Sequence, residues 1–82
     1  MVAEVPQAKI LGEVIRKFRV KKRLSQEALA DLAGIHRTYL GGVERGERNP
    51  SFQSLGRILN ALGISWQDFG EALDQHLRRK HK

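Results

Sequence analysis

The chain has 82 residues, a length that fits one small domain, and 15 Lys and Arg against nine Asp and Glu give it a formal net charge of +6. This excess of positive charge favours a polyanionic partner such as nucleic acid, although a solvated basic surface has the same composition. The chain has no cysteine, no signal-peptide pattern and no apolar run near the roughly 18 residues of a membrane span, so we expect a soluble, cytoplasmic protein without a disulfide, metal or cofactor.

Apolar residues at intervals of three and four predict a first helix over residues 8–22, with a basic face opposite the apolar one. The apolar face consists of Ile10, Leu11, Val14, Ile15 and Phe18. Residues 1–8 are expected to form a short N-terminal arm. Basic residues gather at 16–23, directly before the next predicted helix.

Two short helices follow with almost no linker between them. Ser25 is a good N-cap for a helix over residues 26–32, Gly34 can adopt the left-handed conformation of a turn, and a third helix is expected over residues 36–44. Two helices joined so tightly form a helix-turn-helix. The small and apolar residues that its packing requires are Ala30, Gly34, Ile35, Leu40 and Val43.

The C-terminal half predicts two more helices. After the polar loop 46–50, Ser51 caps a fourth helix that ends at Gly63, and Ser65 caps a fifth helix. The apolar face of the fourth helix contains Phe52, Leu55, Ile58, Leu59 and Leu62, and the fifth helix carries a row of Trp66, Phe69, Leu73 and Leu77. Strand-like alternation is absent from the sequence. We therefore expect an all-α, compact five-helix domain over residues 9–75, followed by a basic tail at 76–82.

The start of the third helix is the main candidate for reading DNA. Arg37 lies opposite Leu40 and Val43, and an arginine can bond O6 and N7 of guanine together in the major groove. Thr38 could meet a base edge or a thymine methyl group, and His36 could donate to a base or a phosphate. The alternative is a solvated helix start at which His36 serves only as a cap.

Other polar residues around the helix-turn-helix are candidates for phosphate contacts. Gln26 starts a helix, where free backbone N–H groups favour an anion. Arg45, Arg48 and Asn49 follow the third helix in a loop, whereas Tyr39 could either reach a phosphate or belong to the core.

Two adjacent glycines, Gly41 and Gly42, cost about 1 kcal/mol each inside a helix. Their presence suggests that side chains there would collide with DNA or with a neighbouring turn, unless the helix end is loosely wound.

Arg19 and Glu44 are polar at positions where periodicity predicts contact between helices. We expect them to form a buried ion pair that fixes the third helix on the first.

A chain this short has little core left to cover the whole row of Trp66, Phe69 and Leu73, which predicts a dimer interface. The alternative, that the fifth helix folds back over the first and fourth, accounts for part of the row. In a dimer, two recognition helices would lie about 34 Å apart in successive major grooves.

The chain resembles the Xre/Cro family of lambda-repressor-like helix-turn-helix domains over residues 10–69. The motifs that carry the resemblance are Leu11-Gly12-Glu13-Val14-Ile15-Arg16, Leu24-Ser25-Gln26-Glu27-Ala28-Leu29-Ala30, Thr38-Tyr39-Leu40, Val43-Glu44-Arg45-Gly46 and Asn60-Ala61-Leu62-Gly63. Within the family, the segments His36-Arg37-Thr38-Tyr39 and Glu44-Arg45-Gly46-Glu47-Arg48-Asn49 are similar to the controller proteins of restriction-modification systems.

The resemblance implies a transcriptional regulator that binds a pseudo-palindromic operator as a homodimer, often governing its own gene and that of a nuclease. RNA polymerase is a further expected partner. The resemblance also implies the pairing of Arg19 with Glu44, a phosphate contact at Gln26, and base reading near Arg37, Thr38 and Gly42. Gly42 departs from the side chain that many family members use for a base contact.

The sequence also bears on two other classes of function. An enzyme is not expected, because His36, His76 and His81 are scattered and no carboxylate pair or nucleophile with a base falls in a predicted pocket. A protein-interaction module, such as an antitoxin or a domain that bridges transcription proteins, is the stronger alternative.

Overall fold

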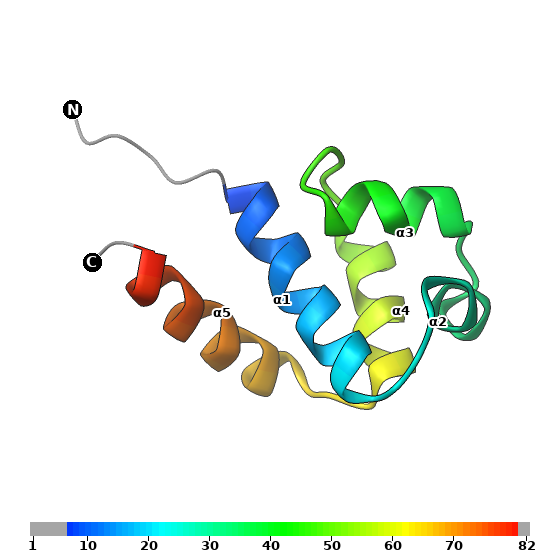
Figure 1. Ribbon diagram of the computed structural model, residues 1–82. Helices are drawn as coiled ribbons and strands as arrows, with labels where there is room; N and C mark the ends of the chain where they lie inside the picture. The colour runs from blue at the N-terminus through cyan, green and yellow to red at the C-terminus, as the bar shows by residue number, and fades with distance from the viewer. Residues whose placement is uncertain (1–6, 81–82) are drawn as a thin grey trace.

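The computed structural model describes residues 7–80, which form five α-helices (Figure 1). Their bounds are Gln7–Lys21 for α1, Gln26–Ala33 for α2, Arg37–Glu44 for α3, Phe52–Leu62 for α4 and Trp66–Lys80 for α5. The all-α, five-helix prediction is confirmed, with helix bounds within about one residue for the first four helices. Residues 1–6 of the predicted arm and residues 81–82 of the predicted tail lie outside the described part of the chain.

Local capping sets most of these bounds. The hydroxyls of Ser25, Ser51 and Ser65 each accept a hydrogen bond of 3.0 Å from the backbone N–H three residues later. These bonds satisfy N–H groups that have no partner in the first turn of a helix. Gly34 and Gly63 end α2 and α4 in the left-handed conformation, each at φ 71°, as their positions in the sequence predict.

The core lies where α1 to α4 meet, and α5 covers it from the side of α1 (Figure 1). Helix α2 packs on α3 and α4, and α1 packs on α3 and α5. The buried apolar side chains are Val14, Ile15, Leu29, Ala30, Ala33, Leu40, Val43, Ile58, Leu59, Leu62 and Phe69. Every helix contributes at least one of them, so α3 is held by packing from the rest of the domain.

A close crossing between α1 and the end of α3 depends on glycine. A methyl group at Gly12 would lie 2.2 Å from the carbonyl oxygen of Val43 and 2.5 Å from that of Glu44. No side chain fits at that distance, so the two helix backbones approach closely only because residue 12 lacks one. This contact was not predicted from the sequence.

The burial of Phe52 and of Phe69 differs from the prediction. Phe52, expected on the buried face of α4, is 79% exposed, because it is the first residue of the helix and stacks on Trp66 instead. Phe69, expected in the dimer interface, is 4% exposed and packs into the core of its own chain. The exposed apolar surface near α5 therefore consists of Phe52 and Trp66.

The predicted basic tail is not a separate segment as far as the structure describes it. Helix α5 continues through residues 76–80, because His76 packs against α1 with its ring nitrogen 2.7 Å from a carboxylate oxygen of Glu13. Arg78 also bonds Asp74 one turn earlier at 2.9 Å. None of the helices within residues 7–80 has the length and apolar character needed to cross a lipid bilayer.

Candidate nucleic-acid interface

The turn between α2 and α3 directs the start of α3 outward. Gly34 reverses the chain, and the backbone N–H of Ile35 donates to the carbonyl of Ala30 at 3.0 Å. Leu40 and Val43 on the inner side of α3 are fully buried. A helix fixed by its inner side in this way presents the opposite side to solvent.

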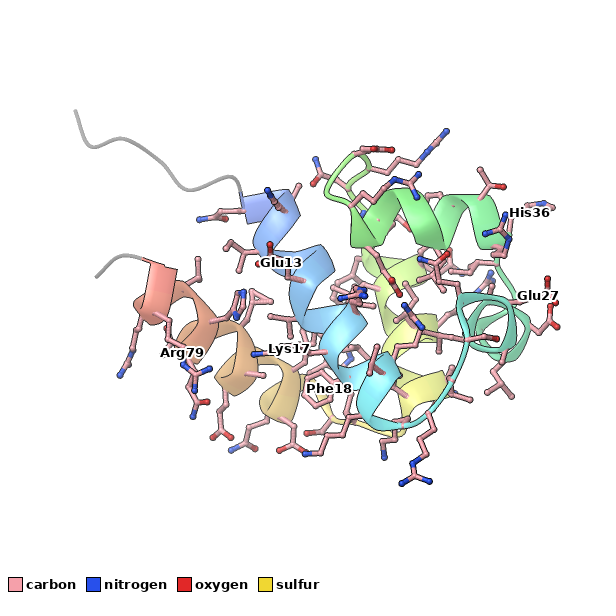
Figure 2. The ribbon with its side chains drawn as sticks, in the orientation of Figure 1. Glu13, Lys17, Phe18, Glu27, His36 and Arg79 are labelled. Atoms are coloured by element: carbon pink, nitrogen blue, oxygen red, sulfur yellow. The ribbon has the colours of Figure 1, made fainter. Side chains whose placement is uncertain are left out.

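The polar residues at the start of α3 are all exposed, and they are His36, Arg37 and Thr38. His36 is the N-cap residue, but its side chain makes no capping hydrogen bond, so its ring does not serve the helix end (Figure 2). Arg37 and Thr38 form no ion pair or hydrogen bond through their side chains within residues 7–80. These side chains are thus available for an external partner.

A buried ion pair holds the other end of α3. The guanidinium of Arg19 donates to both carboxylate oxygens of Glu44, at 2.6 and 3.0 Å, and also to the carbonyl of Leu24 at 2.8 Å. The side chain of Glu44 is 2% exposed and that of Arg19 11%. This two-point contact fixes the orientation of both planar groups, so α3 is attached to α1 in one geometry.

Gln26 joins α2 to the same carboxylate. Its side-chain amide donates to Glu44 at 3.0 Å, and it lies in the first turn of α2 next to the cap residue Ser25. An amide carries two N–H donors, so one remains available for a phosphate. The position of Gln26 is therefore set by the same contact that sets α3.

Arginine side chains cover the two glycines of α3, both of which are buried. A methyl group at Gly41 would lie 3.1 Å from a guanidinium nitrogen of Arg45, and one at Gly42 would lie 3.1 Å from Cδ of Arg48. Gly42 has no side chain and lies under Arg48, so it offers DNA no side-chain group. The base reading that the resemblance implied at Gly42 stays a prediction.

Arg48 folds back along α3 through the space that Gly42 leaves. Its guanidinium carbon lies 6.0 Å from the centre of the half-buried Tyr39 ring, within the range of a cation–π contact. Tyr39 packs against the core with its ring, which is one of its two predicted roles, and the contact of its hydroxyl with a phosphate stays a prediction.

The side chain of Arg45 forms an ion pair with that of Glu47. It forms two hydrogen bonds of 3.1 Å with the carboxylate of Glu47, and both side chains are more than half exposed. These bonds, together with the attraction between the two charges, raise the pKa of Arg45 and hold the pKa of Glu47 below its usual value. A phosphate at Arg45 would have to compete with this carboxylate.

Most of the predicted contact residues lie around the helix-turn-helix. His36, Arg37 and Thr38 lie at the start of α3, and Arg45, Arg48 and Asn49 follow its end. Gln26 precedes both groups in sequence, at the start of α2, and contacts Glu44. The half-exposed Trp66 and the partly buried Leu73, predicted for the dimer interface, belong to α5.

Two residues with a structural role at the interface were missed. Gly12 allows the close crossing of α1 and α3, and Gly46, at φ 77°, lies against the backbone of Lys9 where α1 begins. A glycine inside an amphipathic helix is the signal that could have identified Gly12.

The comparisons with known proteins agree with this geometry. A family model described as helix-turn-helix matches residues 15–69. The control protein C.SmaI of Serratia marcescens is 48% identical over 56 residues, which cover 68% of this chain and 67% of that protein. The control protein C.BamHI of Bacillus amyloliquefaciens is 40% identical over 60 residues, which cover 72% and 74% of the two chains.

Solved structures extend the similarity over nearly the whole chain. The wild-type restriction-modification controller protein C.Esp1396I superposes with a TM-score of 0.87 at 34% identity, covering 93% of this chain and 99% of that one. The tetramer of C.Esp1396I in complex with its natural 35 base-pair operator has a TM-score of 0.84 at 35% identity, covering 90% and 97%.

Proposed function

The chain belongs to the helix-turn-helix family, and from that premise we propose that it is a transcriptional regulator that binds double-stranded DNA in a sequence-specific manner, as a restriction-modification controller does. The observation that carries the proposal is the exposed polar start of α3 on a helix whose other end is fixed by the buried pair of Arg19 and Glu44. The similar proteins named above are control proteins rather than enzymes.

In this proposal α3 lies in the major groove. Arg37 recognises guanine through two hydrogen bonds from its guanidinium, and Thr38 and His36 contact neighbouring bases. Contacts of this kind need a helix held in a defined orientation, because a base edge is recognised only within hydrogen-bond distance. The buried ion pair and the packing of Leu40 and Val43 supply that orientation.

Phosphate contacts flank the recognition helix. We assign them to Gln26, Tyr39, Arg45, Arg48 and Asn49. The assignment rests on the spare amide donor of Gln26, the exposed guanidinium groups and Asn49 after α3, and the hydroxyl of the half-buried Tyr39. These contacts position the protein on DNA, whereas the base contacts provide the sequence preference.

The regulator is proposed to act as a homodimer, with residues 9–75 as the domain that both binds DNA and dimerises. Phe52 and Trp66 stack with ring centres 4.8 Å apart and together form an exposed aromatic surface, which is costly to leave in water. Leu73 is partly buried and adds to this interface only through its exposed part, whereas Phe69 is buried in the core of its own chain. A twofold axis near Phe52 and Trp66 would give the two α3 helices a symmetric arrangement suited to a pseudo-palindromic operator.

The genes it governs are proposed to be its own and that of a nuclease, as the similarity to controller proteins implies. Because a regulator bound at a promoter acts on transcription, we propose RNA polymerase as a further partner. Transcription in vitro from the bound site, with and without the regulator, distinguishes repression from activation.

Selection of bound oligonucleotides from a random double-stranded pool tests the proposal. We expect enrichment of one motif with two inverted halves spaced by about one helical turn. If about 6 to 10 phosphates are contacted, affinity for the selected site should fall by about 10³ to 10⁵ between 50 and 200 mM salt. A pool that stays random, together with affinity for a protein encoded by a neighbouring gene, would instead support an antitoxin or a bridging module.

A further inference from the structure

A second cationic surface lies away from the recognition helix, in a cleft of about 250 Å³ between α1 and α5. Figure 1 shows that α1 has α3 on one flank and α5 on the other, so this cleft and the start of α3 belong to different faces of the domain. The proposed DNA contacts do not use any of its side chains.

The walls of the cleft are basic on both sides. Lys17 and Lys21 extend from α1, and His76 and Arg79 extend from α5. Figure 2 shows Lys17 reaching from α1 toward α5, on which Arg79 lies. Among the residues that the structure describes, no Asp or Glu side chain lines the cleft.

These charges are not neutralised by neighbours. Within residues 7–80, Lys17, Lys21 and Arg79 form no ion pair. The carboxylate beside the cleft, that of Glu13, is held by His76 at 2.7 Å, and Asp74 is bonded to Arg78 on the same helix. Several like charges that face one another across a narrow cleft repel, and an anion between them removes that cost.

The floor of the cleft is apolar. Phe18, Val14 and Ala72 line it between the basic walls. Val14 is almost completely buried, whereas Phe18 is partly buried and keeps some of its surface toward the cleft. An apolar floor under a cationic rim suits a ligand that has both an anionic group and an apolar body.

We propose that this cleft binds a small amphiphilic anion, such as a phosphate, sulfate or carboxylate carried on a single ring or a short apolar chain. Pockets for drug-sized ligands measure about 300 to 1,000 Å³, so a cleft of this volume fits a smaller molecule. The anionic group lies between the side chains of Lys17 and Arg79, and the apolar body contacts Phe18.

Titration with phenyl phosphate, followed by amide and side-chain NMR shifts without DNA, tests this site independently of the proposed regulatory function. We expect saturable shifts at Lys17, Phe18, His76 and Arg79 in the millimolar range. Inorganic phosphate, which lacks the apolar body, should bind at least several-fold more weakly. Equal binding of the two probes, or shifts that centre on α3, would overturn the proposal.

A matched pair of variants assigns the binding to the cleft. The double variant Lys17→Gln and Arg79→Gln removes two exposed cations from the cleft and should weaken phenyl phosphate binding at least tenfold. The double variant Arg16→Gln and Arg57→Gln removes the same charge from exposed positions outside the cleft and should bind as the original protein does. An equal loss in both variants would mean that only net charge attracts the anion, which overturns the site.

Discussion

The carboxylate of Glu44 at the end of α3 accepts two hydrogen bonds from the guanidinium of Arg19, although the two residues are 25 positions apart in the sequence. The pair lies in the interior, and the amide of Gln26 bonds the same carboxylate at 3.0 Å. A single carboxylate thus joins α1, α2 and α3, the three helices that determine where the recognition surface lies.

Replacing Glu44 by Leu should destabilise the domain strongly. The substitution leaves the Arg19 charge buried without its partner, which costs about 3 to 5 kcal/mol in the free energy of unfolding. Urea unfolding measures the change, and Glu71→Leu, at an exposed position of α5, is the control with an expected effect within about 0.5 kcal/mol. The double variant Arg19→Met and Glu44→Leu should recover much of the loss, because no buried charge remains. A double variant as unstable as Glu44→Leu would contradict this view of the pair.

Gly12→Ala and Gly70→Ala should change stability in opposite directions. At Gly12 the new methyl group would meet backbone carbonyl oxygens of α3 at 2.2 and 2.5 Å, so α1 and α3 must separate, at a cost of about 1 to 3 kcal/mol or more. At Gly70, within α5, nothing lies within 4 Å, and the higher helix propensity of alanine should stabilise by about 1 kcal/mol. Thermal unfolding followed by circular dichroism reports both changes. Two variants with the same sign would show that the crossing of α1 and α3 does not limit stability.

Arg37→Ala should reduce binding to the selected operator by about 1 to 3 kcal/mol and affect random DNA little, since a two-pronged contact to guanine is lost. Fluorescence anisotropy with both DNA probes measures this difference. Arg57→Ala, an exposed arginine of α4, is the control for loss of charge. If Arg37→Ala weakens both probes equally, Arg37 is a phosphate contact rather than a base-reading residue.

Glu47→Gln should strengthen binding to DNA. The carboxylate of Glu47 holds Arg45 through two bonds of 3.1 Å and would repel a phosphate. Removing its charge releases the guanidinium and should steepen the dependence of affinity on salt by about one phosphate contact. The control is Glu71→Gln on α5, away from the interface, and unchanged affinity in Glu47→Gln would show that Arg45 does not meet DNA.

The same pair sets a pH dependence at Glu47. Because Arg45 keeps the pKa of Glu47 below its usual value, the pair contributes to stability at neutral pH, and the contribution is lost as the pH falls through the lowered pKa. In NMR titrations, Arg45→Gln should return the pKa of Glu47 toward its usual value. Both side chains are exposed, so the accompanying change in stability should be small.

Phe52→Ala should weaken the proposed dimer. Phe52 is 79% exposed in the single chain, so its removal leaves no cavity in the core, while a partner would lose an aromatic contact. Analytical ultracentrifugation should show a dissociation constant raised at least tenfold. Leu32→Ala, at a residue of α2 that is 64% exposed, is the matched control and should dimerise normally. A wild-type protein that stays monomeric at micromolar concentration would exclude this interface.

The helices and the turn could be predicted from the sequence, because their signals act over a few residues. Caps at Ser25, Ser51 and Ser65 and left-handed turns at Gly34 and Gly63 need only neighbouring residues, and apolar spacing then identifies the inner side of each helix. The exposed start of α3 followed from the same spacing. The pairing of Arg19 with Glu44 was also within reach, since a charged residue at a helix contact needs a partner.

Which apolar residues are covered, and which distant groups come together, depends on how the helices pack. Phe52 lies outside and Phe69 inside because the path from α4 to α5 sets where α5 packs, and neither helix's own pattern contains that path. The close crossing at Gly12 and the placement of Lys17 and Arg79 on the walls of one cleft likewise depend on how separate segments are brought together. Such contacts arise from the packing of the whole chain, so a pattern that repeats every few residues cannot specify them.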